Sequence, residues 1–200
     1  MTLRFQVICV CFGDHPECET PSVTSNRLSD KGLAFKFNDA NKRNLYLRAF
    51  EATRNADGKS IVEQVCDFLN CDEPIYILGE VFGAGVQDLT YGGDTPQFRI
   101  FDVYVGQPCE GKYLNPHEMG YLAISVGVPT VPVLHVGAYS HGALEYHTDG
   151  METASGKEAH MREGIVIKPV EERRHDELGR VILKSVSEKY LLRKNATEYN

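Results

Sequence analysis

Two apolar runs near the C-terminal end of the chain each contain a lysine, and the first of them opens with a carboxylate. Residues 163–169 have the sequence EGIVIKP, so that Glu163 precedes the apolar stretch and Lys168 follows it. Residues 182–190 have the sequence ILKSVSEKY, in which Lys184 stands between apolar neighbours. A charge in such a strand is unfavourable unless it meets a partner or a ligand. The three charged groups are therefore candidates for binding a charged ligand; exposed charges on strands are the simpler alternative.

The distribution of charge along the chain indicates what that ligand could be. The chain has 21 Lys and Arg against 28 Asp and Glu, a net charge of −7, which argues against nonspecific nucleic-acid binding through bulk charge. Residues 162–194 contain nine Lys or Arg and six Asp or Glu, a local charge of +3, which leaves −10 for the remaining residues. A locally basic segment can face phosphates. A solvated charged face is again the simpler alternative.

A third carboxylate and an aromatic ring complete the set of candidates. Glu80 follows the apolar run 75–78 inside a Gly-Glu-x-x-Gly sequence, where glycines allow close approach of the backbone. A turn at the end of a strand is the alternative for this segment. In the expected strand 98–105, alternation places Phe101 on one face with Val103 and Val105, and Asp102 on the other. A core phenylalanine is the ordinary interpretation of Phe101, and Asp102 is a secondary candidate.

These segments, in this order, resemble the motifs of the covalent nucleotidyltransferases, the superfamily of ATP-dependent RNA ligases, DNA ligases and capping guanylyltransferases. The sequences EGIVIKP and LKSVSEKYLLRK, together with Tyr-x-x-Gly-Glu-x-x-Gly and the following 88–92, are most similar to the RNA ligases. The resemblance implies that Glu80 contacts the ribose and that Phe101 stacks on adenine. It implies that Glu163 helps to hold the metal and the reacting phosphate. Lys184 would neutralise the α-phosphate and the departing pyrophosphate.

Two further nucleotide contacts are implied by the same resemblance. The segment 23–27 resembles the stretch that follows the nucleophile in the family, so Arg27 is expected to contact a nucleotide phosphate. Lys168, at the far end of its run, is expected to bind the nucleotide on the face opposite to Glu163. The common form of the last motif carries two lysines two residues apart. Here Lys184 alone is present, flanked by Ile182 and Val186.

The motif that begins the family pattern, Lys-x-x-Gly, does not occur in these 200 residues. Its lysine attacks ATP and carries the AMP, and a site must lower the pKa of an amine for that reaction. Lys59 follows Gly58 instead of preceding a glycine, and it lies after Arg27, so we reject it as the nucleophile. Residues 1–5 resemble those that follow the motif. We therefore expect a single nucleotidyltransferase domain over residues 1–200, truncated on its N-terminal side, with a separate segment supplying the nucleophile.

The family reaction sets the expected partners. ATP adenylylates the enzyme lysine, AMP moves to an RNA 5′-phosphate, and a 3′-hydroxyl displaces AMP, all with a divalent metal such as Mg²⁺. ATP, Mg²⁺ and nicked or broken RNA ends are thus the expected ligands. Two alternatives remain open: a nucleotide- or RNA-binding module without catalysis, and a ligase for DNA or a capping-type enzyme. Whether the chain is itself an enzyme stays undecided at this point.

The composition fits one cytoplasmic domain. No run approaches the roughly 20 apolar residues of a membrane helix. Six irregularly spaced cysteines indicate reduced thiols. A zinc site formed by Cys18, Cys66 or Cys71 with a histidine is a minor alternative.

The elements that must position the candidate residues are mixed. Strands are predicted up to Phe12 and over 33–37, 75–78 (buried on both faces), 98–105 and 131–136. Helices are predicted after Ser60 and Asn115, each with a glutamate three residues on that completes a capping box. The order lacks the regularity of strand–helix–strand units. This favours an α+β nucleotidyltransferase domain, with mainly antiparallel sheets around an ATP cleft.

Overall fold

The computed structural model describes residues 11–12, 22–24, 34–36, 40, 43–52, 54–86, 89–107 and 110–193. Its main sheet is antiparallel and has the strand order β1-β4-β5-β6, formed by Cys11–Phe12, Ile75–Phe82, Gln97–Val105 and Lys112–Tyr113. Three two-stranded antiparallel sheets accompany it: β2 (Ser22–Thr24) with β3 (Ala34–Lys36), β7 (Gly164–Ile167) with β10 (Leu183–Val186), and β8 (Arg174–His175) with β9 (Gly179–Arg180). The α+β class with mainly antiparallel sheets is confirmed.

Five helices complete the described part of the chain: α1 (Leu45–Glu51), α2 (Ile61–Leu69), α3 (Pro116–Val126), α4 (His141–Thr148) and α5 (Glu188–Leu191). The two predicted capping boxes are present, with Ser60 and Glu63 at α2 and Asn115 and Glu118 at α3. The sequence analysis did not predict α1, α4 and α5. Each of these begins at a side chain that accepts hydrogen bonds from the first turn, Asn44, Ser140 and Ser187 respectively.

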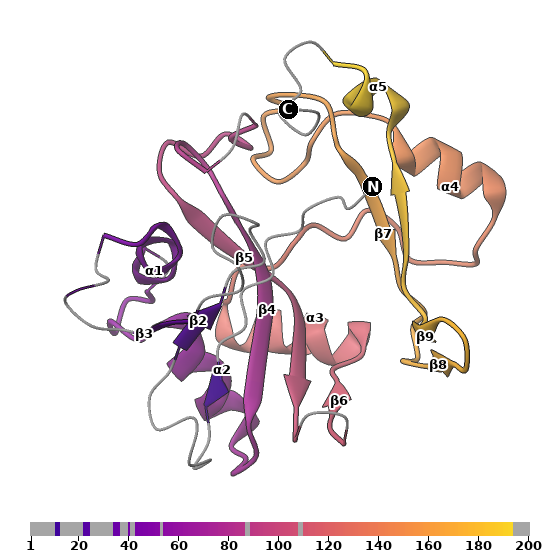
Figure 1. Cartoon of the computed structure of the whole chain (residues 1–200). Coiled ribbons are helices and arrows are strands. Elements are labelled where there is room, and N and C mark those ends of the chain that lie inside the picture. Colours follow the sequence, from indigo (N-terminus) through magenta and orange to yellow (C-terminus); the bar gives the residue numbers. More distant parts are fainter. Residues whose placement is uncertain are drawn as a thin grey trace.

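The hydrophobic core lies on one face of the main sheet. Helices α1, α2 and α3 contribute Phe50, Ile61, Val65 and Leu122 to it, and the sheet contributes the following buried residues: Ile75, Ile77, Val81, Phe98, Ile100 and Val103. The β7–β10 sheet lies on the other side of β4 from α1 and α2, and α4 packs on its outer side (Figure 1). One face of the main sheet is thus apolar and packed. The other face is available for polar contacts with β7 and β10.

A β-bulge in the main sheet decides which face two candidate residues occupy. Leu78 pairs with Asp102, but the next residue of β4, Gly79, pairs with Ile100, so Phe101 is an extra residue in β5. The bulge leaves Ile100 and Val103 in the core and turns Phe101 and Asp102 to the opposite face. The expectation that Phe101 shares a face with Val103, opposite to Asp102, is therefore wrong. Strict alternation fails wherever one strand gains a residue.

The segment around Gly79 also differs from the sequence analysis. Gly79 and Glu80 lie inside β4 and not in a turn at its end. A Cβ atom on Gly79 would overlap the ring of Phe98, which itself stacks on Phe50 with ring centroids 4.4 Å apart. Glycine is required here because the Phe98 ring occupies that space. In addition, the side chains of 75–78 are not buried on both faces, because Tyr76 and Leu78 are half-buried.

The strand predicted at 131–136 is wrong. Its backbone makes one parallel bridge, between Thr130 and Ile100, and Val131 donates to the Ile100 carbonyl at 2.9 Å. Pro132 has no N–H group with which to continue that ladder. The side chains of Val133 and Val136 are 77% and 72% exposed, so they pack against no core. The predicted strands over 33–37 and 98–105 correspond to β3 and β5. Of the strand predicted up to Phe12, Cys11–Phe12 form β1, and the residues before them lie outside the described residues.

Replacing Gly79 by alanine should destabilise the domain by about 1–3 kcal/mol, because the added methyl group forces Phe98 out of its place in a packed core. Gly120, exposed within α3 and with nothing near its missing Cβ, is the matched control. Gly120→Ala should stabilise the protein by about 0.5–1 kcal/mol through helix propensity. Urea unfolding of both variants measures this difference. Equal stabilities would contradict the packing of Phe98 on Gly79.

Candidate functional site between the two sheets

Three of the predicted site residues come together across the two sheets. Glu80 lies on β4, on the face opposite to the core, and its charged neighbours are Glu163 and Lys184. Glu163 immediately precedes β7, and Lys184 lies on β10. Burial, together with the nearby Glu163 carboxylate, raises the pKa of Glu80 to about 7, while the Lys184 ammonium opposes that rise. The site thus combines two carboxylates and one ammonium.

Glu163 is held by the C-terminal segment. Its carbonyl accepts a hydrogen bond from the Ser187 N–H at 2.9 Å, and its carboxylate accepts one from the Tyr190 phenol at 2.9 Å. Gly164 follows with a φ of 148°, and a Cβ there would overlap the Ser185 carbonyl. The Glu-Gly pair therefore allows β7 to begin against β10 while the carboxylate turns toward Glu80.

Lys184 faces the main sheet because of its register in the small sheet. It pairs with Val166 of β7, and its neighbour Ser185 points the other way, where its hydroxyl lies 2.7 Å from the Thr148 hydroxyl of α4. Alternation along β10 then places Lys184 on the side of β4. The side chain is half-buried, as expected for a long amine whose stem is covered and whose charge meets polar groups.

Phe101 and Lys168 form the second part of the site. The ammonium of Lys168 donates to the Phe101 carbonyl and to the Asp102 carboxylate, each at 2.7 Å, and lies 5.9 Å from the centre of the Phe101 ring. Phe101 is half-buried on the face of the sheet that carries Glu80. Lys168 and Glu163 make separate contacts, but both meet the same face of the main sheet, Lys168 at Asp102 and Glu163 near Glu80. The expected placement on opposite faces is therefore wrong, because the backbone of Gly164, with a φ of 148°, interrupts the alternation.

Asp102 is the residue that the sequence analysis ranked too low. Its side chain is 2% exposed, and the guanidinium of Arg180 binds both of its oxygens, at 2.7 and 3.0 Å. Arg180 also donates to Glu172 at 2.9 Å and lies 3.6 Å above the ring of Tyr113. No local pattern marks Arg180, because its partners lie up to 78 positions away. Asp102 thereby ties the C-terminal hairpins to the main sheet.

Tyr190 and Tyr91 were also missed. Tyr91 lies within the segment 88–92 that carried part of the resemblance, and its phenol lies beside the Glu163 carboxylate. Burial and the neighbouring carboxylates raise the pKa of Tyr91, so its phenol stays protonated. Arg27, the remaining predicted nucleotide contact, lies outside the described residues.

The described cysteines and histidines form no metal centre of the zinc type. Within the described ranges, no group of three or more His, Cys, Asp or Glu is arranged to hold a metal ion. Cys66 and Cys71 are free thiols, and burial raises the pKa of Cys66 to about 11. Cys18 lies outside the described residues. Among the described helices, none is both long and apolar enough to cross a membrane.

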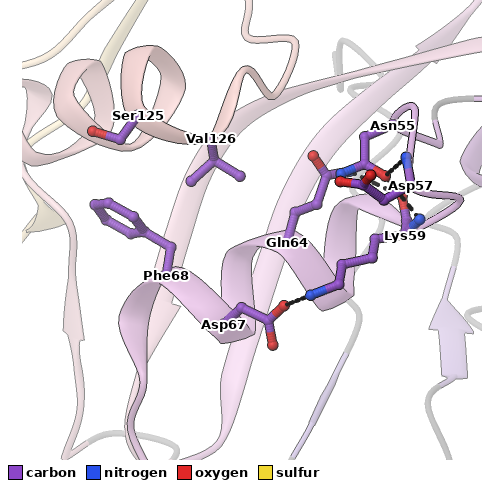
Figure 2. Close-up of a pocket in the computed structure, with 8 residues that line it drawn as sticks. All are labelled: Asn55, Asp57, Lys59, Gln64, Asp67, Phe68, Ser125 and Val126. Atoms are coloured by element: carbon purple, nitrogen blue, oxygen red, sulfur yellow. Dashed lines mark hydrogen bonds and ion pairs between the residues drawn. The ribbon is translucent and has the colours of Figure 1, made fainter.

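An open hollow of about 360 Å³ lies elsewhere, between the loop before α2, α2 itself and the end of α3. Figure 2 shows Lys59 extended there toward Asp67, with Phe68 and Val126 on the apolar side. The hydrogen bond and charge of Asp67 raise the pKa of Lys59. A nucleophilic lysine needs the opposite effect, which agrees with its rejection as the attacking residue. The hollow shares no residue with the site around Glu80.

Comparison with known proteins decides the family. A family model described as RNA ligase matches residues 25–186. The chain belongs to the RNA ligase family. The nucleotidyltransferase fold is also that of solved RNA ligases from Naegleria gruberi. A lysine-to-methionine mutant with AMP and Mn matches with a TM-score of 0.66, and a lysine-to-alanine mutant with ATP and Mn and the ligase with PPi each match with a TM-score of 0.65.

These matches are distant and partial. Each is 19% identical and covers 95% of this chain but 49% of the Naegleria chain, so the chain spans about half the length of those ligases. Comparison with curated protein sequences finds no match. The family therefore rests on the sequence pattern over 25–186, and the structures establish the fold of this RNA ligase family member.

The pKa of Glu80 gives a pH-dependent prediction for the metal-free protein. Because the folded pKa lies above the unfolded value of 4.5, Glu80 favours folding most below pH 4.5, and this contribution is lost as the pH rises through about 7. Glu80→Gln removes the charge, so its stability relative to wild type should increase over that range, by roughly 3 kcal/mol in total. Chemical unfolding at several pH values, with a chelator present, measures it.

Glu63→Gln provides the control with the opposite sign. Hydrogen bonds with Ser60 lower the pKa of the Glu63 carboxylate. The contribution of Glu63 to folding stability is therefore present above pH 4.5 and is lost as the pH falls through the lowered folded pKa. A Glu80→Gln variant whose stability relative to wild type did not change between pH 4.5 and 8 would contradict the desolvated carboxylate pair.

Proposed function

We propose that this chain is the adenylyltransferase domain of an ATP-dependent RNA ligase, which joins RNA ends or seals nicks in RNA repair. The observation that carries the proposal is the convergence of Glu80, Glu163 and Lys184 in a member of the RNA ligase family. These residues come from three strands or strand ends distant in sequence, so no local constraint brings them together. Two carboxylates and one ammonium suit a triphosphate that arrives with a divalent cation.

The donor set fits Mg²⁺ brought by the nucleotide. Carboxylate oxygens are hard ligands, and Mg²⁺ usually binds one or two of them together with substrate phosphates and water. Glu80 and Glu163 provide such a pair. Burial, and after it the neighbouring Glu163 carboxylate, raises the pKa of Glu80, and a cation would offset that repulsion. We assign Glu163 as the metal contact. When bound, the cation supplies charge neutralisation at the reacting phosphate.

The remaining contacts with the nucleotide come from individual side chains of this chain. Lys184 neutralises negative charge on the α-phosphate and on the departing pyrophosphate, and its position on a paired strand fixes it in advance. Glu80, on β4 of the main sheet, accepts hydrogen bonds from the ribose hydroxyls. Arg27 is proposed as a further phosphate contact on the resemblance alone.

Phe101 provides the platform for adenine. Its ring lies on the site face because of the bulge, and stacking of a base on an aromatic ring contributes about 1–3 kcal/mol. Lys168 contacts the nucleotide beside Phe101, and its ammonium donates a hydrogen bond to the Phe101 carbonyl at 2.7 Å. The ion pair with Asp102 fixes the Lys168 side chain, so its position is set before the nucleotide binds.

The nucleophile is proposed to come from a separate segment with a Lys-x-x-Gly motif, since the 200 residues contain none. Such a lysine would attack the α-phosphorus of ATP, forming a phosphorus–nitrogen bond to AMP and releasing pyrophosphate. Lys184 then faces the charge that develops on the departing group. The AMP would pass next to an RNA 5′-phosphate. RNA substrates and the free thiols of Cys66 and Cys71 fit a cytoplasmic location.

A non-catalytic nucleotide- or RNA-binding module is the second candidate, and the missing motif is the observation that favours it. It would use the same residues to bind ATP without forming an adduct. A DNA ligase differs in its polynucleotide, whereas a capping-type enzyme transfers a nucleoside monophosphate to a diphosphate-ended RNA and leaves it there. Parallel assays on nicked RNA, nicked DNA and diphosphate-ended RNA distinguish these possibilities.

Removing either charge at the centre of the site should weaken nucleotide binding without unfolding the domain. We expect Glu163→Gln and Lys184→Met each to weaken Mg²⁺–ATP binding by at least tenfold, about 1.4 kcal/mol, because each loses a charge-assisted contact with the phosphates or metal. Thermal unfolding should change little, since both side chains are only partly buried. Isothermal titration calorimetry and calorimetric melting measure the two effects.

Lys189→Met is the matched control. Lys189 lies five residues after Lys184, is 73% exposed and pairs with Asp149, away from Glu80. Its loss should leave ATP affinity within about twofold, since a charge exposed to salt contributes little. Equal losses in the Lys184→Met and Lys189→Met variants would indicate general electrostatic attraction and not a specific site.

Covalent chemistry provides the decisive test. The 200-residue chain, incubated with α-labelled ATP and Mg²⁺ and then denatured, should show no labelled adduct, because it has no Lys-x-x-Gly motif. Fusing a strand that ends in this motif ahead of Thr2 should restore the adduct and the sealing of nicked RNA. A Lys→Ala version of the added motif is the control and should do neither. An extended protein that binds ATP but forms no adduct would favour the binding module.

A further inference from the structure

Tyr91 has an unusual backbone for its residue type. Its φ is 50°, in the left-handed region that side-chain-bearing residues seldom adopt, and Gly92 follows with a φ of 71°. The turn is closed by a hydrogen bond from the Gly93 N–H to the Thr90 carbonyl at 2.9 Å. Such a conformation raises the free energy by roughly 1–3 kcal/mol and persists where neighbouring contacts enforce it. The contacts that enforce it here lead to the site.

His160 fixes the backbone of Tyr91 from 69 residues away. The Tyr91 N–H donates to His160 Nε2 at 3.2 Å, and the two rings meet edge to face with centroids 4.4 Å apart. The other ring nitrogen, Nδ1, lies 2.8 Å from the Met161 carbonyl, which can only accept a hydrogen bond. The imidazole is thus the neutral tautomer with its proton on Nδ1, because Nε2 must accept.

The loop that presents His160 is itself organised by a buried carboxylate. Glu152 is 1% exposed and accepts from the Ser155 N–H at 2.9 Å and the Ala159 N–H at 3.0 Å, while its own N–H donates to the His160 carbonyl at 2.9 Å. These contacts fix the loop between α4 and β7. The position of Tyr91 is therefore determined by a network that reaches well beyond its own turn.

The phenol of Tyr91 ends at the metal-facing carboxylate of the proposed site. The Tyr190 phenol donates to Glu163 Oε1 at 2.9 Å from a residue that is 2% exposed, and the Tyr91 phenol lies beside the same carboxylate and near Glu80. The hydrogen bond of Tyr190 and the neighbouring Tyr91 side chain restrict the rotation of Glu163. A buried tyrosine with a satisfied hydroxyl is common in cores. Here, however, both phenols lie at the same carboxylate.

We propose that Tyr190 and Tyr91 are positioning residues: the Tyr190 phenol, through its hydrogen bond, and the Tyr91 side chain beside it hold the Glu163 carboxylate in the orientation in which it meets a divalent cation. The inference rests on the proposed function for the role of Glu163, and it adds the residues that orient it. Orientation of a ligating side chain by a neighbouring hydrogen bond commonly changes metal affinity 10- to 100-fold. The left-handed backbone of Tyr91 is then explained, since it directs the ring toward Glu163.

The first experiment needs no ligand. In metal-free protein carrying ¹³C-labelled glutamate, the Glu163 carboxyl resonance, assigned with Glu163→Gln, should shift in Tyr91→Phe and in Tyr190→Phe. Tyr104→Phe is the matched control, because it removes a phenol hydrogen bond to the Gln107 carbonyl at 2.9 Å on the same sheet. Its spectrum should keep the wild-type Glu163 resonance. A Glu163 resonance unchanged in Tyr190→Phe overturns the inference, whatever the protein binds.

The second experiment measures the metal directly. With ATP at a fixed concentration, the Mn²⁺ concentration that gives half-maximal nucleotide binding should rise about tenfold in Tyr190→Phe, while metal-free ATP binding and the melting temperature stay as in wild type. A purely structural role would change the last two quantities instead. Wild-type protein that binds no Mn²⁺–ATP refutes the proposed function; wild-type binding with an unchanged midpoint in Tyr190→Phe refutes the positioning role alone.

Discussion

The carboxylate of Asp102 is the contact on which the arrangement of the domain depends. It is almost completely buried, and it is matched by two cations, Lys168 at the end of β7 and Arg180 on β9. A buried charge is tolerated only when it is paired, and removing one partner of such a pair destabilises a protein by about 3–5 kcal/mol. Because both cations belong to the C-terminal segment, this contact fixes the β7–β10 sheet against the main sheet. The proximity of Glu163 and Lys184 to Glu80 follows from it.

The bulge in β5 makes that contact compatible with the core. A regular strand would place Phe101 and Asp102 on opposite faces, so one of them would point into the packing of α1, α2 and α3. The extra residue turns both toward the small sheet and returns Val103 to the core. The same irregularity therefore supplies the anchoring carboxylate and the proposed adenine platform. Packing on one face of the sheet and chemistry on the other are separated by a single inserted residue.

Local patterns predicted the parts of the structure whose causes are local. Capping boxes begin α2 and α3, and the order of the motifs indicated the family, because these signals lie within a few residues of one another. The bulge at Phe101 and the pairing of Arg180 with Asp102 were not predicted, because both depend on partners distant in sequence. The predicted strand at 131–136 failed where Pro132 cannot donate a hydrogen bond. Apolar content alone did not show that its valines stay exposed.

Among the candidate residues, the sequence identified the charged groups but not what holds them. Glu80, Glu163 and Lys184 lie within short, recognisable sequence motifs, and the structure brings them together. Tyr91 and Tyr190 lie within the same segments, but nothing in those segments assigned them a role, since a tyrosine beside a glycine or in a short helix is common. Their importance appears only from the hydrogen bond of Tyr190 to Glu163 and the position of Tyr91 beside it. Groups that orient a site are in general harder to predict than the groups they orient.

The charged side chains gathered around Glu80 include more carboxylates than ammonium groups. The family's common last motif has two lysines, whereas this chain has Lys184 alone, and Lys168 is already paired with Asp102. Among the described side chains, two carboxylates against one ammonium leave this group negative when Glu80 is ionised, so the proposed site would bind a triphosphate alone only weakly. Under the proposed function, a cation between Glu163 and the phosphates would lower the mutual repulsion of the carboxylates and pair with the ligand. Nucleotide binding at the proposed site should therefore depend more steeply on the divalent metal than at a site with two such lysines, and the orientation of Glu163 would control that dependence.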